Sequence, residues 1–145
     1  MAETLTLRII TPDRVVCEQP VTQVICRAID GELAILPNHQ PLLTALETDV
    51  VRYTVNKEEH SAAVMGGVME VNNNEVTILS DLAELDVEID ETKAHQEKER
   101  AEAEKIQKAD KLDVYLSEMA ISRSIARLKA ADLGRRRRGA RERHL

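Results

Sequence analysis

The sequence predicts an α+β protein, in which an N-terminal antiparallel β-sandwich or flattened barrel is followed by a C-terminal antiparallel two-helix hairpin. All four prolines fall at or before Pro41, and no glycine occurs between Gly67 and Gly134. Short alternating segments fill the first part, whereas helix-forming residues dominate from about Asp90. We therefore expect a sandwich over residues 1–86, a helical domain over 87–134 and a basic, disordered tail over 135–145.

Short strands are expected throughout the first part, because aliphatic residues alternate with polar ones between turn signals. The first strand, 4–11, carries Leu5, Leu7 and Ile9 on one face. Polar turns are expected at 56–59 and 72–75, and Gly66-Gly67 permits a bulge. The further strands are expected at 15–17, 21–29, around Leu33 and Ile35, and at 42–46, 50–55, 60–65, 68–71 and 76–79.

The stretch from Gly31 to Leu43 predicts a strand, a tight turn and a second strand. Pro37 and Pro41 cannot donate ladder hydrogen bonds, so they bracket a loop. Asn38 and His39 stand at its tip. From these residues alone we expect a rigid exposed turn, at which a histidine is more often solvated than a ligand or a base.

Two helices are expected in the second part. Asp90 is expected to cap a helix over 92–109, and Asp110 a second helix that reaches Leu133, with Gly134 just after its end. The first helix offers mainly alanine, so the hairpin should dock weakly on the sandwich. The second helix carries two apolar stripes: Leu112, Leu116, Met119 and Ala126, and Val114, Ile121, Ile125 and Leu128.

One stripe of the second helix has no obvious partner within the chain. We expect the stripe of Val114, Ile121, Ile125 and Leu128 to face another protein. The alternative is that both stripes pack on the sandwich.

Composition excludes several classes of protein. The formal charge is −6, and the aromatic residues are two tyrosines, with no tryptophan and no phenylalanine, which argues against stacking on single-stranded nucleic acid. Cys17 and Cys26 lack metal-like or disulfide-framework spacing and are expected to be buried thiols in a reducing compartment. We expect no signal peptide and no membrane span.

Several ordered motifs resemble the epsilon subunit of F-type ATP synthases from bacteria, cyanobacteria and chloroplasts. They cover nearly the whole chain, although Ala34 and Thr48-Asp49 replace glycines common in the family, and the basic tail is longer than expected. The motifs are Ile10-Thr11-Pro12-Asp13-Arg14, Gly31-Glu32-Leu33, Ile35-Leu36-Pro37-Asn38-His39, Pro41-Leu42-Leu43-Thr44-Ala45-Leu46, Met65-Gly66-Gly67-Val68-Met69-Glu70-Val71, Asn74-Glu75-Val76-Thr77-Ile78-Leu79 and Ile89-Asp90 with Ala94.

The resemblance implies a noncatalytic rotor subunit of a proton- or sodium-translocating ATP synthase. It implies binding to the gamma subunit and the c-ring, coupling of c-ring rotation to ATP synthesis, and inhibition of ATP hydrolysis when the helices extend into the alpha/beta catalytic head. The chain would meet the membrane only through partners, on the cytoplasmic face of a bacterial inner membrane or the stromal face of a thylakoid. No cofactor is required, and no nucleic acid is a partner.

Two sets of site residues follow from the resemblance. Glu32 and His39 match positions that face the c-ring, and Asn38 and Leu42 are their neighbours. Some bacterial members bind regulatory ATP, and the residues that match or surround that site are Glu84, Ile89, Asp90, Lys93, Ala94, Arg100, Arg123 and Arg127.

The ATP site has a weakness in this sequence. Lys93 replaces the arginine of the family motif, and a lysine loses the bidentate geometry toward phosphate. Arg123 and Arg127 are one turn apart on one helix face and are expected to form a cationic clamp with Arg100. The alternative is a solvated hairpin with salt bridges from Glu97, Glu99 and Glu102.

Two other functional classes are considered. An acidic adaptor or a nucleic-acid-binding module would use the arginine-rich tail to bind its partner. In an epsilon subunit the same tail would instead contact an acidic surface of the catalytic head or remain solvated. A small enzyme is not supported, because His39 lacks a partner in the sequence and there is no His-x-x-x-His, Gly-x-Ser-x-Gly or Gly-rich phosphate motif.

Overall fold

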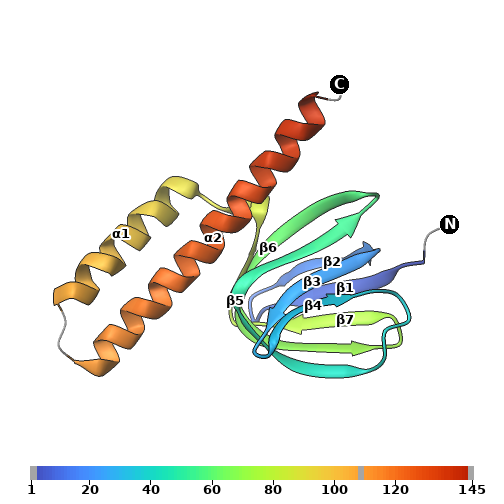
Figure 1. Ribbon diagram of the computed structural model, residues 1–145, viewed down its shortest axis with the longest axis horizontal. Coiled ribbons are helices and arrows are strands. Elements are labelled where there is room, and N and C mark those ends of the chain that lie inside the picture. The colour runs from blue at the N-terminus through green and yellow to red at the C-terminus, as the bar shows by residue number, and fades with distance from the viewer. Residues whose placement is uncertain (1–2, 108–109, 144–145) are drawn as a thin grey trace.

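The computed structural model describes residues 3–107 and 110–143. Figure 1 shows the predicted arrangement: a sandwich of strands and, along one side of it, two antiparallel helices. The strands are β1 (Leu5–Ile10), β2 (Val15–Val21), β3 (Gln23–Ala28), β4 (Gly31–Ile35), β5 (Leu42–Val55), β6 (Glu58–Asn72), β7 (Glu75–Leu79) and β8 (Ala83–Leu85). The expected fold class is confirmed.

The strands follow the order β2-β1-β7-β6-β5-β3-β4, with β8 paired to β6. The pairings are antiparallel except for β1 with β7, which run parallel. The two long strands β5 and β6 pair along almost their whole length and take part in both layers.

Two long strands replace the four shorter ones that were expected around Glu47 and Gly66-Gly67. The ladder continues on both sides of Glu47, through Leu46 opposite Gly67 and Thr48 opposite Met65. Gly66 and Gly67 have φ of 75° and 117°, so they bend β6 without ending it. A side chain at Gly67 would place its Cβ 2.1 Å from the carbonyl oxygen of Leu79.

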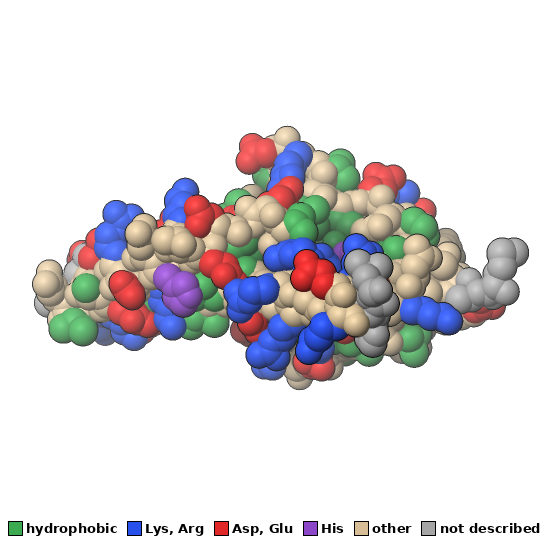
Figure 2. Space-filling view, turned by 90° about the horizontal axis from the view of Figure 1, so that it is seen from above, with side chains coloured by type: hydrophobic (Ala, Val, Ile, Leu, Met, Phe, Trp, Pro, Cys, Tyr) green, Lys and Arg blue, Asp and Glu red, His purple; other side chains and the backbone are tan. Residues whose placement is uncertain are grey.

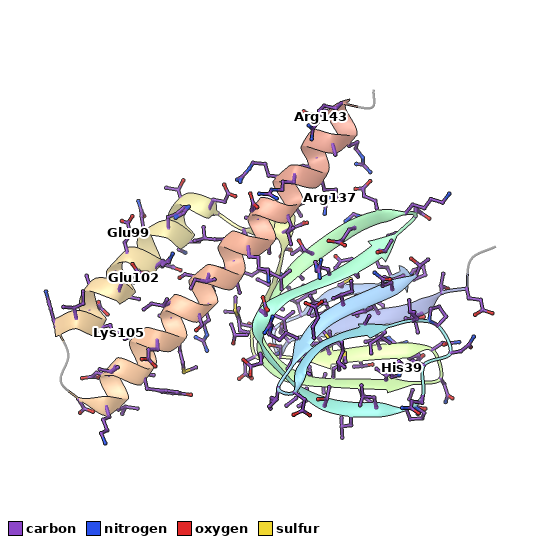
Figure 3. The ribbon with its side chains drawn as sticks, in the orientation of Figure 1. His39, Glu99, Glu102, Lys105, Arg137 and Arg143 are labelled. Atoms are coloured by element: carbon purple, nitrogen blue, oxygen red, sulfur yellow. The ribbon has the colours of Figure 1, made fainter. Side chains whose placement is uncertain are left out.

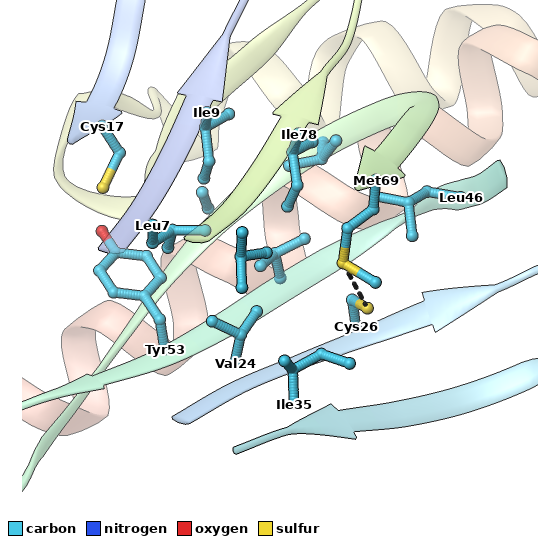
Figure 4. Packing of buried hydrophobic residues seen from close by; sticks show 14 of the residues in the cluster. Leu7, Ile9, Cys17, Val24, Cys26, Ile35, Leu46, Tyr53, Met69 and Ile78 are labelled. Atoms are coloured by element: carbon cyan, nitrogen blue, oxygen red, sulfur yellow. Dashed lines mark hydrogen bonds between the residues drawn. The ribbon is translucent and has the colours of Figure 1, made fainter. Parts of the chain in front are cut away.

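The sandwich core is aliphatic, as expected from a chain so poor in aromatic residues. Leu7, Ile9, Val24 and Ile78 are fully buried and come from strands of both layers (Figure 4). Tyr53 is buried beside them, with its ring 5.7 Å from that of His60. Every buried member of this cluster lies at or before Ala83, so the sandwich has a core of its own.

The helices begin where their capping residues predicted. A short 3-10 turn, η1 (Asp86–Glu88), leads into α1 (Glu91–Gln107), where the Asp90 carboxylate accepts the Lys93 backbone N–H at 3.1 Å. The Asp110 carboxylate accepts the Leu112 N–H at 2.8 Å at the start of α2 (Lys111–Arg143). Ala109, the expected end of the first helix, lies outside the described residues.

The second helix does not end at Leu133, and the expected disordered tail is helical as far as Arg143. Gly134 is buried within the helix instead of following it. Its lack of a Cβ lets the helix approach Asp86, because a Cβ there would lie 2.9 Å from the carboxylate. Residues 144–145 of the tail lie outside the described residues.

Helix α2 connects the hairpin to the sandwich. It contacts β5, β6 and η1, whereas α1 packs mainly against α2. We call the junction the helix seam: the buried residues Ala126 and Ala130 of α2 meet Val50, Ala63 and Met65 of the sandwich. Three of the five buried seam residues are alanines, and Leu82, Ile89 and Leu133 pack against them partly buried, so the seam is much smaller than the sandwich core. The first helix, whose alanine face was expected to dock weakly, contributes none of its described residues to the seam.

Candidate functional site

Arg127 of α2 connects three elements at the inner face of the hairpin. Its Nε lies 2.9 Å from Oε1 of Glu84 on β8, and its Nη1 lies 3.3 Å from Oε2 of Glu97 on α1. The Arg127 side chain is 18% exposed, so the pairs are partly shielded from water. Arg127 thereby fixes the hairpin relative to the sandwich and also fixes α1 relative to α2.

A hollow of about 300 Å³ opens beside Arg127 between the two helices. Arg100 and Arg123 line it together with Arg127. Within the part of the chain that the structure describes, neither Arg100 nor Arg123 forms an ion pair with a carboxylate. Two such cations beside a hollow favour an anionic ligand, because phosphate oxygens accept charge-assisted hydrogen bonds from guanidinium groups.

A second hollow of about 170 Å³ adjoins the first, since Glu97 and Arg127 line both. Glu84, Asp90, Lys93 and Ala94 form its other walls, together with Glu88. Arg14 donates to the Glu88 carboxylate at 2.8 and 2.6 Å, and these hydrogen bonds hold the Glu88 pKa below its usual value.

The two hollows bring together the residues expected around ATP, with one exception. Ile89 lies instead against the helix seam, partly buried. Sequence reasoning did not assign Glu97 to the site, although its position four residues after Lys93 places it on the same helix face. The alternative salt-bridged hairpin is also partly present, because Glu97 pairs with Arg127 and Glu102 with Lys98.

The turn at the far end of the sandwich is held by its own hydrogen bonds. Asn38 has a φ of 66°, and its N–H donates to Oδ1 of Asn74 at 2.6 Å. Its side-chain amide donates to Glu3 at 2.8 Å, and His39 Nδ1 lies 2.6 Å from the Gln40 carbonyl oxygen. Figure 3 places His39 away from the helices, at the opposite end of the sandwich.

The four residues expected at the c-ring do not form one patch. Asn38 and His39 share the turn, whereas Glu32 is exposed at the other end of β4 and lies 3.7 Å from Arg52. Leu42 packs against the core. The apolar side chains exposed near the turn are Leu36, at 51%, and Leu43, at 70%, which sequence reasoning did not single out.

An apolar row crosses the outer face of the sandwich. In register, Ala45 faces Val68, Val68 faces Leu79, Leu79 faces Ile10, and Ile10 faces Val15. Val68 is 42% exposed, and Leu79 and Val15 are each 54% exposed. Exposed apolar side chains that are neighbours across several strands make this face a candidate interaction site. No sequence motif indicated it, because its members come from five different strands.

The row borders a hollow that reaches the helix seam. Ile10, Gly67, Leu79 and the seam residue Met65 line this hollow of about 370 Å³. The helix seam and the apolar row are therefore neighbouring parts of one sheet face. Helix α2 covers the seam but leaves the apolar row open.

The expected partner-facing stripe of α2 is only partly open. Ile125 is 47% exposed, whereas Val114, Ile121 and Leu128 are half-buried. The first turns of α2 carry more open apolar surface, at Leu112 with 62%, Tyr115 with 57% and Leu116 with 52%. Sequence reasoning placed Leu112 and Leu116 in the other stripe, so the exposed surface does not follow the expected division.

The basic end of α2 is largely paired with carboxylates. Figure 2 shows acidic side chains interspersed among basic ones around this end. Arg135 pairs with Glu91 and Asp132, Arg136 pairs with Asp132, and Arg137 and Arg141 pair with carboxylates of the sandwich. Four of the six arginines between residues 135 and 143 therefore have carboxylate partners among the described residues.

The described residues form neither a metal-binding group nor a membrane-spanning helix. Among residues 3–107 and 110–143, no three His, Cys, Asp or Glu side chains are grouped to hold a metal ion. No helix in those ranges combines the length and the hydropathy needed to cross a bilayer.

Comparison with known proteins matches both parts of the chain. Residues 4–86 match the family model of the ATP synthase delta/epsilon chain β-sandwich domain, and residues 88–132 match the model of its long α-helix domain. The chain is 41% identical over 131 residues to an ATP synthase epsilon chain of Desulfitobacterium hafniense, which covers 90% of this chain and 98% of the relative. It is 44% identical over 128 residues to the ATP synthase epsilon chain of Moorella thermoacetica, which covers 88% of this chain and 96% of the relative.

A cyanobacterial relative and two solved structures agree with these matches. The epsilon chain of Synechococcus elongatus is 40% identical over 129 residues, covering 88% of this chain and 94% of the relative. A chain in the Euglena gracilis mitochondrial ATP synthase superposes with a TM-score of 0.76 at 24% identity, covering 88% of this chain and 81% of that chain. A chain in the central stalk and c-ring of the Tetrahymena thermophila mitochondrial ATP synthase superposes with a TM-score of 0.61 at 15% identity, covering 89% of this chain and 97% of that chain. These two likenesses concern the fold.

Proposed function

The chain belongs to the family of ATP synthase epsilon chains, and from that membership we propose that it is a noncatalytic central-stalk subunit. In this role it couples c-ring rotation to ATP synthesis through the gamma subunit, and its helical hairpin inhibits ATP hydrolysis. The observation that carries the proposal is the division of the core. The sandwich core is complete without the helices, whereas the helix seam is small and rich in alanine.

The apolar row is the surface that we assign to the gamma subunit. Val15, Leu79 and Val68 are exposed across neighbouring strands, and a soluble protein gains by covering such a surface. Replacing Leu79 with Glu should weaken assembly with gamma, while Val87→Glu, at a position that is 62% exposed and outside the row, serves as the matched control. Equal loss of assembly in the two variants would assign the interface elsewhere.

The turn of Asn38 and His39 suits a contact that transmits torque to or from the c-ring. Asn38 donates hydrogen bonds to Asn74 and Glu3 that hold the tip, so a lateral force moves the sandwich and not the loop alone. Leu36 and Leu43 supply exposed apolar surface beside the turn. The chain would then be peripheral on the cytoplasmic face of a bacterial membrane, or on the stromal side of a thylakoid, and held there by its partners.

Deletion of residues 87–145 tests the inhibitory role of the hairpin. The shortened chain keeps the sandwich core and the apolar row, so the complex should assemble. Its ATP hydrolysis should rise by a factor of several, because the inhibitory element is gone. Assembly is checked by subunit stoichiometry after purification. Unchanged hydrolysis by an intact complex would show that the hairpin does not inhibit this enzyme.

ATP is the regulatory ligand that the hairpin hollow would hold. Arg100 and Arg123 offer guanidinium groups without carboxylate partners among the described residues, and Arg127 lies beside them. Bound between α1 and α2, a triphosphate would favour the folded hairpin, because that conformation alone brings the arginines together. Glu84 and Asp90, in the adjoining hollow, would contact the remainder of the nucleotide.

Calorimetry with ATP tests this site on the full chain. Arg123→Gln should weaken binding about tenfold or more, because a charge-assisted contact to phosphate is lost. Lys93→Arg should tighten binding, since arginine restores bidentate geometry. Arg138→Gln, on the same helix but outside both hollows, is the control. An absence of heat up to millimolar ATP, or equal weakening by the control, would reject the site.

A further inference from the structure

Residues 134–143 continue α2 beyond the part of the chain that matches the family model, which ends at residue 132. We call them the C-terminal segment. It runs past the turn between β5 and β6, and the two enclose a groove of about 710 Å³ lined by His60, Leu133, Arg137, Ala140 and others. Figure 3 shows Arg137 where α2 passes the sandwich and Arg143 farther along the helix.

A buried carboxylate lies under the start of this segment. Asp86 is 5% exposed, and its Oδ2 lies 2.5 Å from Nη1 of Arg137, whose side chain is 12% exposed. The Ser61 hydroxyl lies 3.2 Å from the same oxygen and 3.3 Å from the Ala130 carbonyl oxygen. Strand β6, η1 and α2 are therefore joined at one polar point in a mostly apolar junction.

A second carboxylate ties the segment to the β5–β6 turn. Glu58 Oε1 lies 3.2 Å from Nε of Arg137, and Glu58 Oε2 lies 2.7 Å from Nη2 of Arg141. Arg137 and Arg141 are one helical turn apart, so both face the sandwich. Gly134 completes the junction, because any Cβ there would collide with the Asp86 carboxylate.

We propose that the C-terminal segment is an intramolecular latch that holds the helical hairpin down on the sandwich. Lifting the hairpin separates Arg137 from Asp86 and Glu58, and Arg141 from Glu58. Breaking a buried ion pair costs more than breaking a surface pair, because a desolvated charge loses its partner. The latch thus adds to the weak apolar seam and shifts the hairpin toward its folded position. Its regulatory meaning rests on the proposed function of the hairpin.

Hydrogen exchange of the full chain tests the latch. Arg137→Gln keeps the length of the side chain and removes its charge. The matched control is the neighbouring Arg138→Gln, whose guanidinium is exposed and has no carboxylate partner among the described residues. In Arg137→Gln the amides of residues 124–134 should exchange about tenfold faster or more, as local opening becomes easier. Amides of β1 and β7, within the sandwich core, should keep their protection.

Each outcome of this experiment decides the question. Equal exchange in Arg137→Gln and Arg138→Gln would overturn the latch. Lost protection in β1 and β7 would also overturn it, because Arg137 would then stabilise the whole fold and not the docking alone. In the double variant Asp86→Asn with Arg137→Gln, exchange should return part of the way toward wild type, since no buried charge is left unpaired.

ATP hydrolysis by the assembled complex separates this inference from the proposed function. If the hairpin inhibits hydrolysis when it lifts, Arg137→Gln should lower the hydrolysis rate relative to Arg138→Gln. Faster exchange with unchanged hydrolysis would leave the latch standing and reject inhibition by the lifted hairpin. Unchanged exchange would reject the latch whatever the hydrolysis rate.

Discussion

Cys26 illustrates how the aliphatic core controls the chemistry of single residues. Its thiol lies between the two layers, with Sγ 3.6 Å from Sδ of Met69 (Figure 4). Burial raises the pKa of Cys26 to about 11, and burial likewise raises that of Cys17. Both thiols are therefore protonated and unreactive near neutral pH, which suits a structural role.

Alkaline pH should reduce the stability of the fold. The Cys26 thiol of the unfolded chain ionises near its ordinary pKa of 9.0, whereas in the folded chain it stays protonated until about 11. The folded state thus holds more protons in this interval, so stability falls as pH rises, by up to about 1.4 kcal/mol per pH unit for this group.

Urea unfolding measured between pH 8 and 10 checks this prediction. Below pH 8 the Cys26 contribution is fully present, and its loss should begin near pH 9. Cys26→Ala should unfold more easily at every pH, yet show a shallower loss with rising pH. Parallel pH profiles for the two proteins would contradict it.

Gly134 and Lys93 show what a single position can and cannot reveal. A glycine near the expected end of a helix usually occupies the position just after that end. That prediction was wrong for Gly134, which lies inside α2. The requirement for glycine came from the Asp86 carboxylate, which is distant in sequence. Lys93, by contrast, is where the local motif placed it, at the start of α1 beside Asp90.

At the scale of elements, small residues allow α1 and α2 to pack closely. Ala94 and Ala101 are buried on α1, and Ser117, Ser124 and Ala131 are buried on α2. Both sets repeat every seven residues, which keeps them on one face of each helix over two turns. The hairpin thus relies on close backbone approach rather than on large side chains.

Ser124→Leu should separate the two helices. Ser124 is 1% exposed where α1 and α2 approach each other, beside the hollow of about 300 Å³, so a leucine there has to push between the helices and should destabilise the hairpin by about 1–3 kcal/mol. Hydrogen exchange of α1 should accelerate while β1 and β7 stay protected. Ser122→Leu, at an exposed position two residues earlier, is the control. Similar exchange in both variants would show that Ser124 is not a close-packed contact.

Element type was predictable from the sequence more readily than element length. The capping residues Asp90 and Asp110 marked the helix starts, because capping is a local hydrogen bond. The continuity of β5 past Glu47 was missed, since the partner strand that supports it is not a local signal. Strand β8 was missed too, because three residues carry too little pattern.

At the scale of the whole molecule, the two parts differ in how much they depend on each other. The sandwich core draws every buried member from residues up to Ala83. The hairpin, in contrast, obtains its larger apolar contacts from Val50, Ala63 and Met65 of the sandwich. The sandwich should therefore fold alone, whereas the helices should not.

Residues 1–86 expressed alone should unfold cooperatively and keep the strand signature in circular dichroism. The fragment should also bind a hydrophobic dye more strongly than the full chain, because removal of α2 uncovers Val50, Ala63 and Met65. Peptide 87–145 should have much less helix than in the full chain, as α1 has little apolar surface. A fragment 1–86 without cooperative unfolding would contradict this division.

The candidate sites were predictable only where they follow local motifs. The residues at the start of α1 and the arginine pair of α2 were assigned from sequence and line the adjoining hollows. The pairs of Arg137 with Asp86 and of Arg127 with Glu84 were not, because they join residues 51 and 43 positions apart. The apolar row was missed for the same reason.

The two tyrosines fall one in each part of the chain. Tyr53 is 3% exposed within the sandwich, and Tyr115 is 57% exposed on α2. Since the chain has no tryptophan, these phenols are its fluorophores. Tyr53→Phe would leave emission from the hairpin alone, and Tyr115→Phe emission from the sandwich alone. Melting of either half can then be followed spectroscopically without attaching a dye.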